Sequence, residues 1–204
     1  MERYRQAVAL TLKFILAIWF LSASLAANSQ TLKYNLKPLS QISELGNKKG
    51  VAILYLKAQG TAPSMIIKPV SLTANQKFQR YKGSTDYKVN LKGFEPGFYQ
   101  LTLPKGSYQI TEINAPFYDL PFSKDTNNDI TWRFTVKTQM LSYIGELQID
   151  GERSRNHVEI NLFNRYASQY QPLKKLVTQL QIPYPLITGQ AYHDDFARDF
   201  EGSE

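Results

Sequence analysis

The sequence of 204 residues has no cysteine and only two histidines, His157 and His193. Without cysteine the chain has no disulfide framework, no thiolate nucleophile and no lipid anchor of the bacterial lipoprotein kind. It also lacks the G-x-S-x-G, H-E-x-x-H, phosphate-binding and dinucleotide-binding motifs. These absences exclude the enzyme classes that depend on such motifs, and they predict no catalytic residue, no cofactor and no metal.

The histidines and the acidic residues do not combine into a metal site. His157 alternates with the apolar face of its strand, so its imidazole is expected to face solvent. His193 has only nearby carboxylates as partners. The stretch DTNND (125–129) begins like a calcium loop, but Ile130 stands where that loop needs glycine and Val136 where it needs glutamate. An Asx-type turn before a strand is predicted there instead.

Long apolar runs are scarce, and the one at residues 14–25 lies near the start of the chain. Basic residues precede it, and small residues at positions 24 and 26 suit a signal peptidase. The run is shorter than the roughly 20 residues that cross a bilayer. We therefore expect a secretory signal at residues 1–26, cut after Ala26, and export through the Sec pathway to the periplasm or the extracellular space. The alternative is an uncleaved anchor, which would hold the protein to a membrane.

The charge is unevenly distributed. The formal net charge is +7, and cleavage of the signal removes three basic residues and one acidic residue, which leaves +5. The last eleven residues carry −4, so residues 27–193 carry +9. A basic body can meet an anionic surface, and a solvated surface is the simpler alternative. The expected partners are an envelope protein, a glycan or an anionic surface, and not nucleic acid, because no reading motif is present.

Short runs with period two dominate the chain after residue 50. The continuous apolar run at 50–57 predicts a buried strand, and Pro69 predicts that the strand at 64–73 lies at an edge or bends. Further alternating runs are 85–93, 97–103, 107–113, 130–138, 140–150 and 157–162. We expect an all-β, mainly antiparallel fold, a single β-sandwich of about eight to ten strands over residues 27–165.

Two glycines carry local predictions. Pro104 and Gly106 fit a tight turn, which predicts a hairpin with Tyr99 and Tyr108 facing inward. Gly145 interrupts a row of apolar residues of one parity, Leu141, Tyr143, Leu147 and Ile149. Such a glycine predicts a bulge or a crossing aromatic side chain, for which Trp132 is the candidate.

The pattern changes after residue 165. Leucine and valine spaced three, four and seven apart predict a short amphipathic helix at 172–181, with Pro172 in its first turn. Residues 166–204 are thus expected to form a C-terminal helix and an acidic tail.

The stretch LPKGSYQITEI, followed about twenty residues later by WRFTVKTQMLSYIGEL, resembles exported bacterial sandwich domains of the transthyretin-like or carboxypeptidase-regulatory type. The resemblance covers about residues 97–150. It implies a non-catalytic module, often attached to other proteins or to the envelope, and it carries over no catalytic residue.

The expected function is therefore binding or scaffolding in the bacterial cell envelope. The stretch between residues 112 and 130 reads as a long surface loop. Its aromatic side chains would be costly to leave fully exposed, so the loop is expected either to pack on the sheet or to form a recognition surface. The candidate ligand-binding residues are Phe117, Tyr118, Phe122, Arg133 and Lys137. The alternative is a hydrolase of an envelope polymer that uses carboxylates such as Glu112, Asp119 or Glu146, which requires a pair about 5 to 9 Å apart across a cleft.

Overall fold

The structure is a computed structural model of the chain. It describes residues 30–42, 44–59, 63–72, 78–80, 84–91, 93–116, 120–152, 154 and 156–190. The expected signal at 1–26 and the acidic tail lie outside the described residues.

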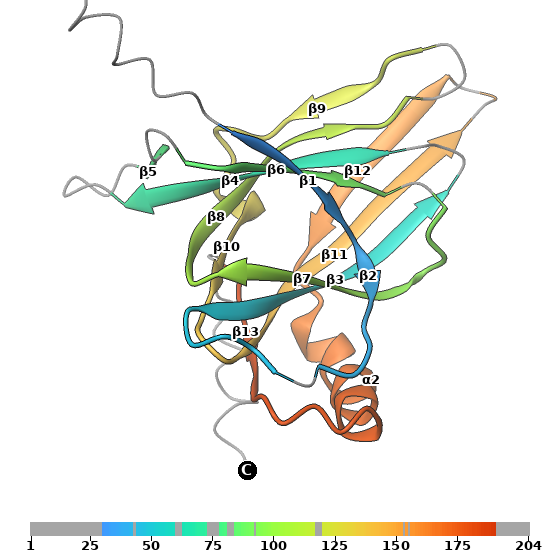
Figure 1. Cartoon of the computed structure of the whole chain (residues 1–204). Coiled ribbons are helices and arrows are strands. Elements are labelled where there is room, and N and C mark those ends of the chain that lie inside the picture. The colour runs from blue at the N-terminus through green and yellow to red at the C-terminus, as the bar shows by residue number, and fades with distance from the viewer. Residues whose placement is uncertain are drawn as a thin grey trace, which may run out of the picture.

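Two facing β-sheets form the body of the protein (Figure 1). Sheet A has the order β1 (Thr31–Asn35), β6 (Asp86–Asn90), β4 (Ser64–Leu72), β8 (Gly106–Asn114), β10 (Arg133–Val136), with β5 (Phe78–Arg80) on β4 and β9 (Ser123–Asp125) on β8. Sheet B has the order β12 (His157–Phe163), β11 (Leu141–Glu152), β3 (Lys49–Gln59), β7 (Gly97–Pro104), β2 (Lys37–Pro38), with β13 (Leu186–Thr188) on β11. The helices named in the described part of the chain are the short 3-10 helix η1 (Ile130–Trp132) and α2 (Tyr166–Gln179).

The predicted all-β class is confirmed. Most strand pairs are antiparallel, but both sheets are mixed, because β1 pairs with β6, β3 with β11, and β11 with β13 in parallel. The described residues form thirteen strands instead of eight to ten, since several strands of two or three residues lie in segments that show no sustained period.

Apolar side chains from both sheets fill the space between them, and a second cluster lies on the outer face of sheet B. On β3, Ala52 and Leu54 face sheet A, whereas Val51 and Ile53 face α2. All four side chains are fully buried. Burial on two faces explains why this strand reads as a continuous apolar run.

The predicted hairpin at Pro104 and Gly106 is wrong. β7 pairs with β3 and β2 in sheet B, while β8 pairs with β4, β9 and β10 in sheet A. The chain therefore crosses between the sheets at Lys105. An alternating pattern fits both a hairpin and a crossing between sheets, because alternation determines which face of a strand is buried and not which strand pairs with it. The inward orientation of Tyr99 and Tyr108 is confirmed, since both are buried.

The bulge predicted at Gly145 is present. The register between β11 and β3 shifts between Tyr143 and Gly145, whose φ is +126°. The shift moves the apolar side chains to the opposite face, so the expected single row is wrong: Tyr143 packs under α2, whereas Leu147 lies between the sheets. A Cβ at Gly145 would lie 2.6 Å from Nε2 of Gln190, so Gln190 covers this glycine in place of Trp132.

Pro69 lies in an interior strand, not at an edge. β4 pairs with β8 along one side, and along the other it pairs first with β6, up to Ile67, and then with β5, from Val70. Pro69 falls between those two partners. Its missing N–H therefore costs no ladder bond on that side.

The C-terminal helix begins earlier than predicted. α2 starts at Tyr166, and Pro172 lies inside it instead of in its first turn. The helix is fixed by packing more than by local preference, because Tyr166, Leu173 and Val177 are buried against sheet B. Within the described residues, no helix is both long enough and apolar enough to cross a membrane.

The segment 185–190 joins the two sheets at one end of the sandwich. The N–H of Gly189 donates to the carbonyl oxygen of Tyr143 on β11 at 2.7 Å, and the carbonyl of Gly189 accepts from the N–H of Thr135 on β10 at 2.6 Å. Gln190 forms a bridge with Phe134 of β10. The gap between β10 and β11 is therefore closed by backbone hydrogen bonds.

Candidate functional site

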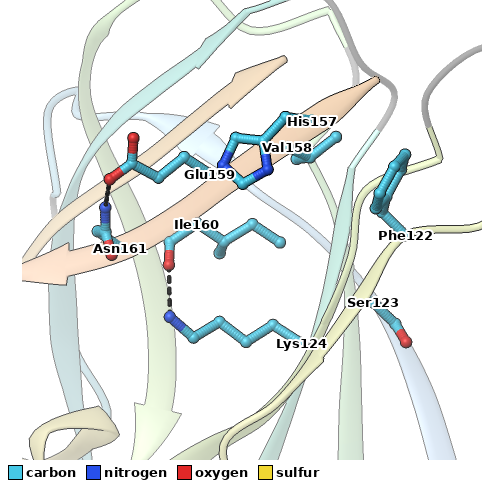
Figure 2. Close-up of a pocket in the computed structure, with 8 residues that line it drawn as sticks. All are labelled: Phe122, Ser123, Lys124, His157, Val158, Glu159, Ile160 and Asn161. Atoms are coloured by element: carbon cyan, nitrogen blue, oxygen red, sulfur yellow. Dashed lines mark hydrogen bonds between the residues drawn. The ribbon is translucent and has the colours of Figure 1, made fainter. Parts of the chain in front are cut away.

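At the other end of that gap, the described residues form no backbone hydrogen bond between the two sheets. β9 and β12 are edge strands of different sheets, and between them lies a groove of about 330 Å³ (Figure 2). One wall is formed by Phe122, Ser123 and Lys124, and the other by residues 157–161 of β12. The lining combines the apolar side chains of Phe122, Val158 and Ile160 with polar ones, as ligand sites commonly do.

The turn after β9 is held in place by polar contacts. The Asx-type turn predicted for residues 125–129 is confirmed, because Oδ1 of Asp125 accepts hydrogen bonds from the backbone N–H and the side-chain amide of Asn127. These bonds hold the pKa of Asp125 below its usual range. On the neighbouring strand β8, the buried side-chain amide of Gln109 donates to the carbonyl oxygens of Thr126 at 2.6 Å and Asn127 at 3.0 Å. The wall that carries Lys124 is thus anchored to β8.

Lys124 spans the groove. Its ammonium donates to the carbonyl oxygen of Ile160 at 2.6 Å and lies 5.3 Å from the centre of the Trp132 ring. The positive charge of Lys124 also lowers the pKa of Asp129, although hydrogen bonds from Thr131 are the larger cause. In the described part of the chain, no carboxylate lies within ion-pair distance of this ammonium. A half-buried positive charge therefore rests on neutral acceptors.

The outer side of β12 is polar. The amide of Asn161 donates to Oε1 of Glu159 at 2.6 Å, and His157 is exposed at the end of the strand (Figure 2). The solvent-facing orientation predicted for His157 is confirmed. Between these residues, Val158 and Ile160 point toward the core between the sheets.

The structure separates the residues proposed from the sequence as ligand-binding. Phe117 and Tyr118 lie outside the described residues. Phe122 lines the groove, close to one end of β8, because its carbonyl accepts from the N–H of Ala115. Lys137 is exposed and follows Val136, which pairs with Gly106 at the other end of β8.

Arg133 lies between these positions. It is half-buried and pairs with Gln109, to which its Nε donates at 3.1 Å. Its burial slightly disfavours the charged guanidinium and lowers the pKa, although Asp129 acts in the opposite direction. Arg133 thus supports the turn that carries β9 and does not line the groove.

The carboxylates named for a hydrolase are not brought to one cleft. Glu112 faces away from the core, because its neighbour Ile113 points into it, and its Oε1 accepts from Asn114. Glu146 lies on the outer face of sheet B, where its Oε2 is 3.3 Å from Nε2 of Gln169 in α2. Two packed sheets separate these carboxylates. Asp119 lies outside the described residues.

Sequence reasoning did not single out Lys124, Glu159 or Asn161. Two features of the sequence could have indicated these residues: a lysine inside an aromatic loop, and a strand with charged residues on its polar face. Neither shows that β9 and β12 come together, because their contact depends on how the two sheets pack. Among the described residues, no three His, Asp or Glu side chains gather where they could hold a metal ion.

No protein-family model matches this chain, and no curated protein matches it. A comparison with solved structures finds a leucine-rich repeat protein from Bacteroides thetaiotaomicron that is 13% identical, with a TM-score of 0.27. The match covers 64% of this chain and 16% of that one. At this TM-score the similarity does not indicate a common fold.

Proposed function

We propose that this protein is an exported, non-catalytic β-sandwich that binds or scaffolds other molecules in the bacterial cell envelope, and that the groove between β9 and β12 holds the ligand. The observation that carries the proposal is the groove itself. It combines an aromatic side chain, an ammonium group and an exposed edge strand within about 330 Å³. The sequence supports the location through its predicted signal, and the charge of +9 on residues 27–193 favours anionic partners.

Membership in the transthyretin-like or carboxypeptidase-regulatory families remains a prediction. The hydrolase alternative is not favoured, because Glu112 and Glu146 lie on opposite outer faces. A binding role requires no such pair. It requires a surface whose side chains can be changed without unfolding the sheets.

Retention of envelope material on the immobilised protein tests the proposal. Phe122→Ala shortens the aromatic wall of the groove and is expected to reduce retention at least about fivefold, because an aromatic contact contributes on the order of 1 kcal/mol. The matched control is Phe98→Ala, which removes a half-buried phenylalanine from the outer face of sheet B. It is expected to leave retention unchanged.

Thermal unfolding of both variants separates loss of binding from loss of fold. Equal retention by the parent and by Phe122→Ala, with both folded, contradicts the assignment of the groove. Failure of the parent protein to retain any envelope component contradicts the binding function itself.

A further inference from the structure

The two ends of the gap between the sheets are closed by different means. At one end the backbone of residues 185–190 bonds to both β10 and β11. At the other end only the side chain of Lys124 crosses from β9 to β12 among the described residues (Figure 2). A gap that a whole lysine side chain spans is wider than the 4.7 to 4.9 Å between directly paired strands. β9 and β12 are therefore not paired with each other, and the groove between them leaves space beside the edge of β12.

Among the described residues, β12 pairs only with β11, and its other edge presents backbone groups to the groove. The carbonyl of Ile160 points at Lys124, away from β11. Because N–H and C=O groups of alternate residues point to the same side of a strand, Val158 and Leu162 also direct theirs toward the groove. An unpaired edge of this kind is a template for another strand.

Half-buried apolar side chains flank the edge. Val158 and Leu162 pack against the core between the sheets but remain partly exposed, and Phe122 is also half-buried. A strand in the groove would cover these side chains and gain roughly 25 cal/mol for each Å² of apolar surface removed from water.

Lys124 determines the chemistry of the inserted strand. A peptide that pairs with Ile160 displaces the ammonium of Lys124 from the Ile160 carbonyl. A neutral peptide would leave this half-buried charge without an acceptor, which is costly. A carboxylate on the peptide replaces the lost bond with a stronger, charge-assisted one.

We propose that the groove binds an extended acidic segment of a partner protein, which adds to β12 as a strand and pairs one carboxylate with Lys124. The inference rests on the proposed function and specifies its ligand. The positive charge of residues 27–193 favours the same class of partner. Strand addition to an exposed edge is an established way for a protein to hold a peptide.

A library of ten-residue peptides displayed on phage, selected on the full protein, tests this inference. The selected peptides are expected to share β-branched residues and one Glu or Asp. A synthetic peptide with the common sequence is then compared with a twin in which Gln or Asn replaces the acid. The acidic peptide is expected to bind about tenfold more tightly, since a hydrogen bond to a charged group contributes about 1.5 to 3 kcal/mol.

Two pairs of variants separate the charge from the strand pairing. Lys124→Met should bind both peptides with equal affinity. Lys137→Met makes the same change directly after β10, away from the groove, and should keep the tenfold preference. Val158→Pro should abolish binding of both peptides, because it removes an N–H that points to the groove and not one bonded to β11. Val158→Thr keeps this N–H and should bind normally.

The inference is overturned if the twin peptides bind the parent protein equally, if Val158→Pro binds as well as Val158→Thr, or if selection yields no acidic peptide. A dimer in light scattering that Val158→Pro dissociates would overturn it too, because a second copy would then occupy the edge. If a folded Phe122→Ala protein loses retention of an envelope component that is not a peptide, the proposed function stands and this inference fails.

Discussion

Two tyrosines fix the positions at which the chain turns between strands. The hydroxyl of Tyr99 donates to the carbonyl oxygen of Glu95 at 2.6 Å, and that of Tyr108 donates to the carbonyl oxygen of Pro104 at 2.7 Å. Each bond reaches back four residues, as in the tyrosine corner of other β-sandwiches. Burial raises the pKa of both hydroxyls, so both remain neutral donors at physiological pH.

Removing either hydroxyl tests this role. Tyr99→Phe and Tyr108→Phe are each expected to lower the free energy of unfolding by about 1 kcal/mol, because each loses one hydrogen bond while the ring stays packed. Tyr55→Phe is the control, since Tyr55 packs edge-on against Phe98 and its hydroxyl forms no hydrogen bond with the described residues. Urea denaturation measures all three. Equal stability of Tyr108→Phe and the parent would contradict the role.

The carboxylate of Asp129 makes the stability of the fold depend on pH. The hydroxyl of Thr131 donates to Oδ1 of Asp129 at 2.7 Å, and this bond is the largest cause of the lowered pKa of Asp129. A lowered pKa in the folded state contributes stability above the ordinary value of 3.8, and the contribution is lost as the pH falls through the folded-state pKa.

Thr131→Val should therefore raise the pKa of Asp129 toward 3.8. A carboxyl-carbon NMR titration measures the change directly. Asp125 serves as an internal control, because Asn127 lowers its pKa and Thr131 does not. An unchanged Asp129 titration would show that other contacts hold the carboxylate.

For single residues, the sequence predicted which side chains are buried better than it predicted which side chains touch one another. Alternation correctly placed Tyr99 and Tyr108 inside, because a strand has only two faces. It could not place Lys124 against Ile160, since these residues are 36 positions apart and belong to different sheets.

At the scale of elements, β3 and the segment after β10 approach unusually closely. A Cβ at Gly50 would lie 2.0 Å from the carbonyl oxygen of Lys137, a backbone atom that cannot turn aside. Glycine is thus required at the crossing for space and not for backbone conformation. The sequence offered no sign of this, because Gly50 stands at the start of an ordinary strand pattern.

Gly50→Ala is therefore expected to lower the free energy of unfolding by more than about 3 kcal/mol, or to prevent folding, because β3 or residue 137 must move. Gly46→Ala is the matched control, since a Cβ there meets nothing within 4 Å. Thermal unfolding and the soluble yield of both proteins measure the difference. Similar stability of the two variants would contradict the close approach.

The order of strands was less predictable than the strands themselves. The hairpin expected at Pro104 and Gly106 is a crossing between sheets, although the strands on both sides were located correctly. A proline and a glycine fix a local bend, and the neighbours of each strand depend on pairings with distant segments. The early start of α2 has the same origin, because Tyr166 is held by a distant sheet and not by helical spacing.

At the scale of the whole molecule, the predicted signal makes export a measurable property. Expression in a bacterium with an intact Sec pathway should yield a protein whose N-terminus is Ala27. Ala26→Phe should prevent cleavage, because signal peptidase accepts only small residues at that position. Mass spectrometry of the purified protein distinguishes the two forms. A parent protein that still begins at Met1 would support the uncleaved anchor.

The parallel pairing of β3 with β11 also limits how the chain can fold. Val51 pairs with Leu141, 90 positions later, and residues 185–190 join the two sheets by backbone hydrogen bonds. A chain that is made from its N-terminus onward therefore leaves β3 without this neighbour until most of the protein has emerged. Contacts so distant in sequence make folding slow, on the scale of milliseconds to seconds. The position of β11 in the chain thus makes completion of sheet B depend on the last third of the sequence.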